Sequence, residues 1–444
     1  MAAAAAAADK TPAITKVETL RCGAGFRDFC FVKMSTDAVT KEGKPVVGWS
    51  EYLEERNIGV TQVIEWMGTL VTGQNPLPYG KLVAQLKANT RHVSGGIAQQ
   101  GVAAIENALL DVVGKIYDVP VCALLGGPIR TELEMYWSHC GSFRLPYSDM
   151  LVDETKKPVT PLKSNGDIKG LVAEVADAGY RGLKTNIFMF PEDGKPSLYM
   201  PGFGGGAESP QLRVTDDLVE HIVTQMRVFR HGDEHCRDLP NKLELRLDLN
   251  YNFKTDGFIR VAQALTPQAL GGRGLEWLEL DIASPAALRQ IRDAAPMPIA
   301  SLESVMGRRD LKPYLDAGAV DICIIDPLWN GVAESVKMAE LCEVYEVNCA
   351  AHNYHGWLGT VICAHFCAAI PNFAVLETDV DDVPWKDDIV TVVPEVVRGV
   401  LKLPLGPGWG IDVDEDALKL YPATNDPKSG IWSAAAASAD TDKV

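Results

Sequence analysis

The stretch LELRLDLN, residues 243–250, has the two-residue period of a β-strand, because its leucines alternate with Glu244 and Arg246. It ends on two polar residues, Asp248 and Asn250, which alternation places on one side of the strand at its C-terminal end. The neighbouring segments indicate what a carboxylate held at that position could do.

Seven other segments between residues 131 and 395 also have the form of short apolar strands. They are LEMYWSH, GLKTNIF, LEWLELD, MPIASLE, AVDICIID, VNCAAHN and FAVLETD. Amphipathic stretches such as GVAESVKMAELCEVYEV separate them. Eight strand–helix alternations with short turns predict an α/β fold of the TIM-barrel type over 131–395. The alternative is an open doubly wound sheet, but its usual nucleotide-binding loop is absent from the sequence.

Residues 14–130 have a different pattern, which predicts a separate α+β domain. Three strand-like segments, ITKVETLRCG, FCFVKMST and KPVVGWSEY, precede the helical segment GVAAIENALLDVVGKIYD. In that segment apolar residues recur at helical spacing, with Glu106 and Asp111 on other faces. The Gly-Gly-Pro of LLGGPIR marks the boundary. The alanine-rich ends, 1–13 and 426–444, are expected to be disordered.

Composition excludes several classes of partner. The formal net charge of −17 argues against nucleic acid and against an anionic membrane. No apolar run approaches the roughly 18 residues that a membrane-spanning helix needs. The ten cysteines form no Cys-x-x-Cys pair and most have apolar neighbours, so we expect reduced, buried thiols in a cytoplasmic protein.

Polar side chains end seven successive strands of the predicted barrel. They are Lys184, Asp248, Glu279, Glu303, Asp326, His352 and Glu377. In a TIM barrel the carboxyl ends of all strands meet at one face, where such proteins do chemistry. A single acid at a strand end is more often a helix cap or a solvated residue. Seven in succession predict a functional site.

Three of these residues predict a metal site. Asp248, Glu279 and Glu303 end adjacent strands, and three carboxylates would repel one another strongly without a cation. An all-oxygen shell favours Mg²⁺ over Zn²⁺. The alternative for Asp248 is a solvated strand end. The absence of any His-x-His motif, with His139 standing alone at the first strand, argues against a two-metal amidohydrolase site.

His352 and Asp326 end neighbouring strands and form a candidate general base with its orienting carboxylate. The alternative is a buried histidine that bonds to backbone, and His355, three residues on, is a rival base. Lys184 is the cation among these acids and is a candidate for binding a substrate carboxylate or an enolate oxygen.

This constellation resembles the enolase superfamily, and within it the mandelate racemase subgroup, over roughly residues 14–425. The resemblance implies a capping domain at 14–130, a modified (β/α)7β barrel at 131–395, and a segment at 396–425 that returns to the cap. It implies one Mg²⁺ per subunit, bound by acids that end the third, fourth and fifth barrel strands. The corresponding residues are Asp248, Glu279 and Glu303 for the metal, His352 and Asp326 for the His–Asp dyad, Glu377 for the electrophile and Lys184 for the first lysine of the Lys-x-Lys motif.

The sequence departs from the family pattern at three positions. Glu279-Leu280-Asp281 stands where Glu-Glu-Pro is usual, so only Glu279 carries over. Asn186 replaces the second lysine of Lys-x-Lys, and Asn250 stands where some dehydratases of the family have a histidine acid. We expect both asparagines to bind substrate. The loss of the second base argues against two-base racemisation and favours a syn elimination in which His352 both takes and returns the proton.

We therefore expect a Mg²⁺-dependent dehydratase of a sugar acid, an aldonate or aldarate, and a homo-oligomer. It would remove the C2 proton to give an enediolate, then eliminate the 3-hydroxyl to give a 2-keto-3-deoxy acid. The alternatives are a cycloisomerase or epimerase of the same superfamily and a non-catalytic barrel. Specificity is expected from loops near 23–28 and 52–57 and from the insertion at 190–213.

Overall fold

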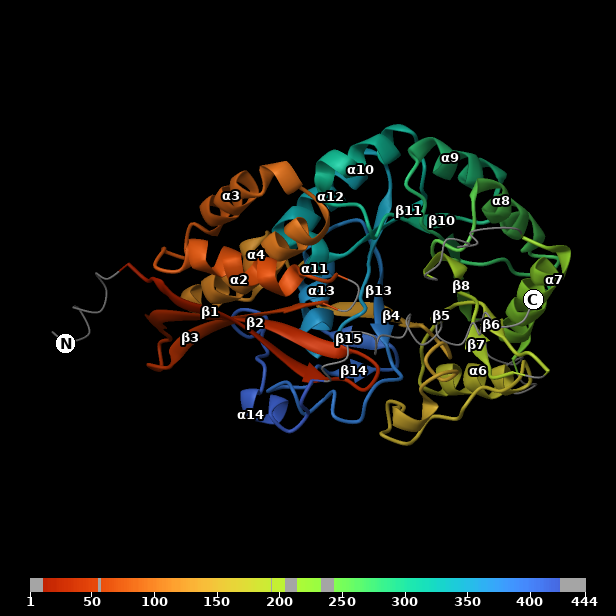
Figure 1. Cartoon of the computed structure of the whole chain (residues 1–444), viewed down its shortest axis with the longest axis horizontal. Helices are drawn as coiled ribbons and strands as arrows, with labels where there is room; N and C mark the ends of the chain where they lie inside the picture. Colours follow the sequence, from red (N-terminus) through yellow and green to blue (C-terminus); the bar gives the residue numbers. More distant parts are fainter. Residues whose placement is uncertain (1–10, 55–56, 193, 204–213, 233–242, 424–444) are drawn as a thin grey trace.

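The computed structural model describes residues 11–54, 57–192, 194–203, 214–232 and 243–423. The two ends expected to be disordered lie outside these residues, except for 11–13. The cap consists of a three-stranded antiparallel sheet, two helices packed on it, α2 and α4, and a third helix, α3, packed on those two (Figure 1). Its elements are β1 (Ile14–Gly23), β2 (Asp28–Val39), β3 (Pro45–Tyr52), α2 (Val60–Val71), α3 (Tyr79–Asn89) and α4 (Gly96–Tyr117).

Eight parallel strands form a closed barrel, as the strand pattern predicts. In order round the barrel they are β4 (Glu132–Ser138), β5 (Gly182–Thr185), β8 (Glu244–Asp248), β9 (Trp277–Glu279), β10 (Ile299–Ser301), β11 (Ile322–Ile325), β12 (Asn348–Ala351) and β13 (Phe373–Asp379). Pairing of β13 with β4 closes the ring. All eight strand segments quoted from the sequence are therefore confirmed.

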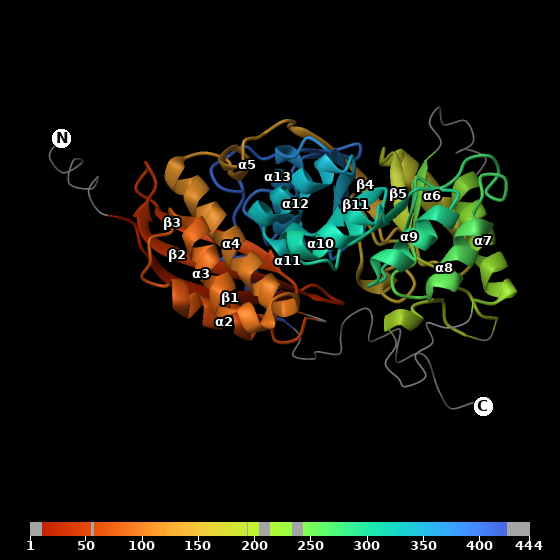
Figure 2. The ribbon, with the colours of Figure 1, turned by 90° about the horizontal axis from the view of Figure 1, so that it is seen from above.

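Helices follow the first seven strands and cover the outside of the barrel (Figures 1 and 2). They are α6 (Asp167–Asp177), α7 (Asp216–His231), α8 (Thr255–Ala264), α9 (Pro285–Ala294), α10 (Gly307–Asp316), α11 (Pro327–Asn330) with α12 (Val332–Val344), and α13 (Trp357–Ala369). After β13 the chain forms β14 (Val396–Val397) and β15 (Val400–Lys402) instead, and β15 pairs antiparallel with β4. This is the (β/α)7β arrangement that was expected.

Smaller elements complete the described chain. They are α5 (Val121–Leu124), α14 (Glu415–Leu418), the hairpin of β6 (Phe188–Met189) with β7 (Ser197–Leu198), and 3₁₀ turns at Arg91–Val93, Ser148–Met150 and Pro201–Phe203. Among the described residues, no helix has both the length and the apolar character needed to cross a bilayer. The nine described cysteines are free and buried, whereas Cys236 lies outside the described residues.

Side chains fill the barrel interior below its mouth. Tyr136, Trp277 and four smaller apolar residues form a buried cluster there. The guanidinium of Arg246 lies over the rings of Tyr136 and Trp277, at 4.9 and 4.2 Å from their centroids. The barrel is thus a packed core, and its open space lies at the carboxyl ends of the strands.

Helix α4 packs against both the cap sheet and the barrel helix α11, so almost all of its faces are buried. Its two acids, which the periodicity places on other faces than the apolar stripe, lie inside the molecule. Glu106 Oε1 accepts a bond of 2.9 Å from the amide of Ala333, at the start of α12. Asp111 accepts bonds from the amides of Trp49 and Trp409. These acids join the cap, the barrel and the C-terminal segment.

Candidate active site

A pocket of about 310 Å³ opens at the carboxyl ends of the barrel strands. Lys184, Asp248, Glu303 and His352 line it. The other lining residues are Leu53, Asn57, Gln100, His139, Phe203, Asn250, Tyr251, Ser304, Met306, Trp329 and Tyr354. Glu279, Asp326 and Glu377 lie directly behind this lining, because each is bonded to one of its members. The seven strand-end residues therefore converge at one place.

The three acids proposed as metal ligands come from β8, β9 and the turn after β10. Asp248 and Glu279 are register partners on adjacent strands. Asp248 Oδ1 accepts a bond of 2.8 Å from the amide of Asn250, and Glu279 Oε2 accepts one of 2.9 Å from Trp277 Nε1. Glu303 Oε2 lies 3.4 Å from His352 Nε2, and Leu302, which precedes Glu303, has a left-handed φ of 94°. Such strain in a leucine is uncommon and is often found at functional sites.

Lys184 is the cation among these acids. Its Nζ lies 2.7 Å from Glu279 Oε1, 2.8 Å from Glu377 Oε1 and 3.7 Å from Asp248 Oδ2. Burial by itself would lower the pKa of Lys184, but the carboxylates of Glu279 and Glu377 outweigh it and raise that pKa well above its usual value. Lys184 therefore carries a full positive charge in a buried, acid-rich site.

The donor chemistry of the three acids fits the magnesium ion expected from the sequence. As the side chains stand, no group of three or more acidic, histidine or cysteine residues in the described chain is arranged to hold a metal ion. Glu279 faces Lys184, and Glu303 faces His352. Burial, together with the negative charge of other acids in the group, raises the pKa of all three carboxyls, Asp248 included. A hard cation would relieve that repulsion.

His352 and Asp326 form a close pair. His352 Nδ1 lies 2.7 Å from Asp326 Oδ2, and Asp326 Oδ1 accepts bonds from the amides of Leu328 and Trp329 at the start of α11. Burial alone would raise the pKa of Asp326, but the two histidines beside it, His352 and His355, hold it well below its usual value. Asp326 is thus a carboxylate, His352 Nδ1 carries hydrogen, and His352 Nε2 is left for the pocket.

His355, the rival base, lies behind the pocket. It is 2% exposed, its Nε2 is 3.8 Å from Asp326 Oδ2, and its Nδ1 is 3.9 Å from Glu51 Oε1. Glu51 belongs to β3 of the cap and accepts bonds from the amides of Gly356 and Gly359 at the start of α13. His355 is therefore placed to support Asp326 from behind and does not line the pocket.

Glu377 is fixed by three donors. Ser138 Oγ lies 2.5 Å from Glu377 Oε1, and the amide of Asn353 donates to Glu377 Oε2 at 2.8 Å. Lys184 is the third. Burial would raise the pKa of Glu377, but Lys184 and His352 lower it to about 2. Glu377 is therefore ionised, and its oxygens are occupied by protein donors.

The two asparagines differ in position. Asn250, in a left-handed conformation with φ of 45°, lines the pocket. Asn186 is 2% exposed and lies behind it, where its Oδ1 accepts a bond of 2.7 Å from Ser142 Oγ. Asn186 Nδ2 donates to Asn250 Oδ1 at 3.3 Å. Asn186 is thus placed to orient Asn250, and substrate contact is proposed for Asn250 alone.

Three acid–base residues at the site were not identified from the sequence. His139 Nδ1 lies 2.8 Å from Asp379 Oδ1, so His139 has a carboxylate partner. Asp281, two residues after Glu279, is buried, and burial and the charge of Glu303 raise its pKa well above the usual value. Two features of the sequence could have indicated these residues. His139 directly follows the segment of β4, and a second acid stands two residues after the strand-end glutamate in LELD (Asp281) and in LETD (Asp379).

Segments of the cap and of the 190–213 insertion in the barrel border the pocket. Leu53 and Asn57 come from the loop after β3, and Phe203 comes from the described part of the 190–213 insertion. Arg27, from the loop at 23–28, is buried and bonds to Asp382 Oδ2 at 2.8 Å, so it joins the cap to the barrel. Tyr52 is also buried, and its hydroxyl lies 2.9 Å from that of Thr61.

The chain matches known proteins along most of its length. A family model described as "Enolase C-terminal domain-like" matches residues 167–417. A D-xylonate dehydratase of Haloferax volcanii is 26% identical over 82% of this chain and 80% of its own length. A D-galactarolactone cycloisomerase of Agrobacterium fabrum is also 26% identical, over 84% of this chain and 87% of its own.

A solved structure gives a higher identity. A protein of Burkholderia xenovorans strain LB400, provisionally named an L-alanine-DL-glutamate epimerase, is 36% identical with a TM-score of 0.85. That match covers 94% of this chain and 100% of the other. A second structure of that protein contains magnesium and fumarate. The names of these relatives agree on a family and disagree on the reaction.

Proposed function

The chain belongs to the enolase superfamily, in its mandelate racemase-like group, and we propose that it is a Mg²⁺-dependent dehydratase of a sugar acid. The observation that carries this proposal is that one pocket brings together a histidine–aspartate pair, His352 and Asp326, and three carboxylates, of which Asp248 and Glu279 are buried and Glu303 is partly exposed. An imidazole whose Nδ1 is held by a carboxylate is suited to accept a proton at Nε2.

Different residues would carry out proton removal and charge stabilisation in the first step, the formation of the enediolate. His352 would remove the proton on C2 of the substrate, and Asp326 would stabilise the imidazolium that forms. Lys184, fully charged, would stabilise the negative charge that develops on the substrate carboxylate as an enediolate forms. Asn250 and the cap residues Leu53 and Asn57 would hold the rest of the sugar chain. Loss of the 3-hydroxyl and ketonisation would then give a 2-keto-3-deoxy acid.

Asp248, Glu279 and Glu303 would hold Mg²⁺, which when bound supplies positive charge for a substrate carboxylate. The relatives support both parts of this proposal. A dehydratase of D-xylonate is among the similar sequences, as are several D-galactonate dehydratases, and the related Burkholderia structure contains magnesium with a carboxylate, fumarate.

A cycloisomerase or an epimerase is the second candidate, because related proteins carry those names. Asn186, which has no basic group, stands where a racemase of this group has its second base. A one-base cycloisomerase would still be compatible with the site. The product of the reaction distinguishes the candidates.

The test is incubation of the purified protein with a panel of aldonates and aldarates, D-xylonate and D-galactonate included, in the presence of Mg²⁺. Semicarbazide detects the 2-keto acid that a dehydratase forms. We expect His352→Asn to reduce product formation and C2 hydrogen exchange in D₂O by at least about 10³-fold, since proton transfer begins with this residue. Binding of Mg²⁺ should survive in the same variant.

The matched control is His221→Asn, on α7 and outside the pocket lining, where the imidazole bonds only to the carbonyl of Phe188 among the described residues. It should keep full activity. Formation of C2 epimers or of isomerised lactones, with no 2-keto acid from any member of the panel, would favour the second candidate. C2 exchange that persists in His352→Asn would exclude His352 as the base.

A further inference from the structure

The pocket contains a second histidine–carboxylate pair, built like the first. His139 follows β4 and Asp379 ends β13, and these two strands are hydrogen-bonded neighbours. Likewise His352 follows β12 and Asp326 follows β11, its neighbour in the barrel. In both pairs the imidazole Nδ1 faces the carboxylate, at 2.8 Å for His139 and 2.7 Å for His352. Both imidazoles line the pocket.

The two imidazoles face the pocket from different sides. In the order of the barrel, β4 lies four strands from β10 in either direction, so His139 stands across the mouth from Glu303. His352 Nε2, in contrast, lies 3.4 Å from Glu303 Oε2. A substrate that binds with its carboxylate toward the acids of β8–β10 would therefore place the next carbons of its chain between His352 and His139.

The ring of His139 is held in one orientation. The residue has a left-handed φ of 44°, and its ring stacks on Phe143 at 4.8 Å between centroids with 21° between planes. Tyr354 meets the ring edgewise at 5.5 Å. With Nδ1 toward Asp379, the other nitrogen, Nε2, is the one available to the pocket. Backbone strain of this kind commonly accompanies a functional side chain.

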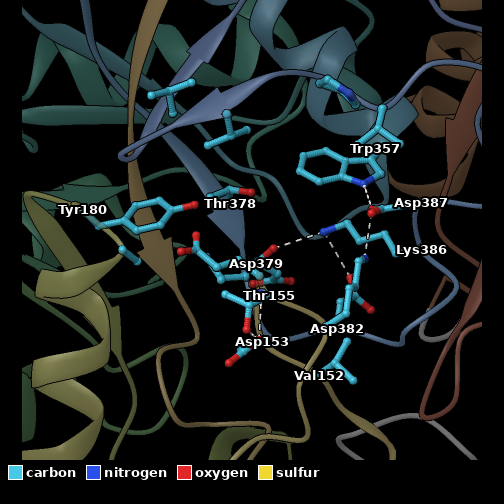
Figure 3. Close-up of a pocket in the computed structure, with 18 of the residues that line it drawn as sticks. Val152, Asp153, Thr155, Tyr180, Trp357, Thr378, Asp379, Asp382, Lys386 and Asp387 are labelled. Carbon is cyan, nitrogen blue, oxygen red and sulfur yellow. Dashed lines mark hydrogen bonds and ion pairs between the residues drawn. The ribbon is translucent and has the colours of Figure 1, made fainter.

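Asp379 is held in turn by residues that do not line the candidate active-site pocket. Arg27 Nη1 lies 3.5 Å from its Oδ2. Figure 3 shows Lys386 reaching the Asp379 backbone carbonyl, at 3.1 Å, and Asp382 Oδ2, at 3.2 Å. Burial alone would raise the pKa of Asp379, but its interactions with His139, Arg27 and Lys386 lower that pKa. Asp379 is thus a fixed carboxylate, and the hydrogen between the two residues belongs to His139 Nδ1.

Dehydration requires a proton donor as well as a base, because hydroxide is a poor leaving group. Of the described residues that line the pocket, only His139 and His352 carry imidazoles. Lys184 is engaged by two carboxylates at 2.7 and 2.8 Å, which hold its proton. Once His352 has taken the C2 proton, His139 is the remaining imidazole of the described lining and can supply another proton from a different direction.

We propose that His139 is the general acid that protonates the departing 3-hydroxyl, and that Asp379 is the residue that positions it. This inference rests on the proposed dehydratase function. The C2–H bond breaks and its proton passes to His352 Nε2, and the C3–O bond breaks as His139 Nε2 gives its proton, so that water leaves. The enol becomes the 2-keto acid when its hydroxyl proton is lost and C3 gains one. Solvent returns a proton to His139 and takes one from His352. Two histidines thus replace the single-histidine syn elimination expected from the sequence.

The test separates proton removal from elimination. The probe is the sugar acid of the panel that the wild-type protein dehydrates, together with its 3-deoxy-3-fluoro analogue, whose fluoride leaves with little need for a proton. His139→Asn should lower the loss of water by about 10²–10⁴-fold, the usual contribution of a general acid. It should keep C2 hydrogen exchange in D₂O within about threefold of wild type, because His352 is intact. Retained exchange also shows that the variant is folded.

Loss of fluoride from the analogue should differ less than about tenfold between wild type and His139→Asn, since this step bypasses the acid. His352→Asn should lose both reactions. Asp379→Asn should reproduce the separation in milder form, with elimination reduced and exchange kept. A merely structural role would reduce exchange and elimination together. His221→Asn is the control for replacing a histidine and should change neither.

The outcomes also separate this inference from the function on which it rests. If wild type forms a 2-keto acid and His139→Asn forms it as fast, or loses exchange in step with elimination, the role of His139 is wrong and the dehydratase stands. If wild type forms no 2-keto acid from any member of the panel, the dehydratase falls and the role of His139 falls with it.

Discussion

At the scale of single residues, the site depends on one buried cation. Lys184 is 2% exposed and contacts carboxylates from two other strands, Glu279 on β9 and Glu377 on β13. A buried charge is tolerated when partners compensate it, and removal of one partner leaves the others uncompensated. Lys184 therefore has a structural role in addition to the one proposed for it in catalysis.

The substitution Lys184→Met tests that role. Without divalent metal it should lower the free energy of unfolding by about 3–5 kcal/mol, because several buried carboxylates lose their cation. Added Mg²⁺ should then raise the unfolding midpoint of the variant more than that of wild type, since it would restore positive charge beside the same acids. Urea unfolding with EDTA or with Mg²⁺ measures both effects.

Lys156→Met is the matched control, because Lys156 pairs with Asp387 at 2.8 Å but is 44% exposed in its side chain. Its loss should cost less than about 1 kcal/mol. Equal stabilities of Lys184→Met and wild type in EDTA would show that Lys184 does not compensate these carboxylates.

Sequence reasoning located individual strand-end residues but not all of their partners. Asp248 and Glu279 could be placed because each ends an apolar strand at a regular interval. The pairing of His139 with Asp379 joins residues 240 positions apart, at the two strands that close the barrel. Spacing along the chain carries no signal for that closure, so His139 looked solitary. The partners of Arg27, Asp379 and Asp382, likewise lie far from it in sequence, so no nearby residue indicates these contacts.

At the scale of secondary-structure elements, α4 shows how a polar side chain joins two parts of the fold. Glu106 is 2% exposed and accepts bonds from the amides of Ala333 and Glu334, in the first turn of α12. A carboxylate at a helix N-terminus is normally favourable. Here burial is the larger effect and raises the pKa of Glu106 to about 7, although Lys87 and the two amides oppose the shift.

The raised pKa predicts the pH dependence of one substitution, Glu106→Gln. The folded state binds the proton of Glu106 more tightly than the unfolded state, whose pKa is near 4.5. This contribution to stability is complete below about pH 4.5 and is lost as the pH rises through about 7. Glu106→Gln should therefore match wild type near pH 5 and exceed it at pH 8 by up to about 3 kcal/mol, at about 1.4 kcal/mol for each pKa unit. Urea unfolding at the two pH values measures this.

Glu334→Gln provides a control of opposite sign. Burial would raise the pKa of Glu334, but Arg308 and Lys87 lower it to about 2, so its contribution is present above pH 4.5 and lost only as the pH falls toward 2. This variant should be less stable than wild type at both pH 5 and pH 8. No gain in stability for Glu106→Gln at pH 8 would contradict the account of Glu106.

The elements themselves were largely readable from the sequence. Apolar alternation identified the strands and helical spacing identified α4, because both follow from which face is buried. The burial of Glu106 and Asp111 was not readable, since periodicity cannot show that a helix is covered on both sides by cap and barrel. The antiparallel pairing of β15 with β4, where an eighth helix would otherwise stand, also had no local signal.

At the scale of the whole molecule, buried polar contacts join the cap to the barrel at separate places. The side chain of Glu51, on β3, accepts hydrogen bonds from the amides of Gly356 and Gly359 at the start of α13, at 2.6 and 2.7 Å. Glu106, on α4, accepts a hydrogen bond from the amide of Ala333 at the start of α12. Arg27, in the loop before β2, bonds to the carboxylate of Asp382. The C-terminal segment also reaches the cap, where the amide of Gly23 donates to the carbonyl of Tyr421 at 2.8 Å. Buried donors and acceptors in the cap therefore have their hydrogen-bond partners in the barrel, and would lose those partners if the two parts separated.

This sharing predicts that cap and barrel unfold together, and Glu51→Ala tests it. The substitution leaves two buried amides of α13 without an acceptor, so we expect a loss of about 2–3 kcal/mol of unfolding free energy. Because Glu51 belongs to the cap sheet, amide hydrogen exchange should accelerate in β3 and α2 as well as in α13. Glu134→Ala removes an exposed ion pair with Arg181 at 2.8 Å. It should change the free energy of unfolding by less than about 0.5 kcal/mol and leave the amide exchange rates of the cap and of α13 as in wild type. If protection is lost in α13 while the cap keeps the protection of wild type, the two parts are coupled too weakly for Glu51 to link their stabilities.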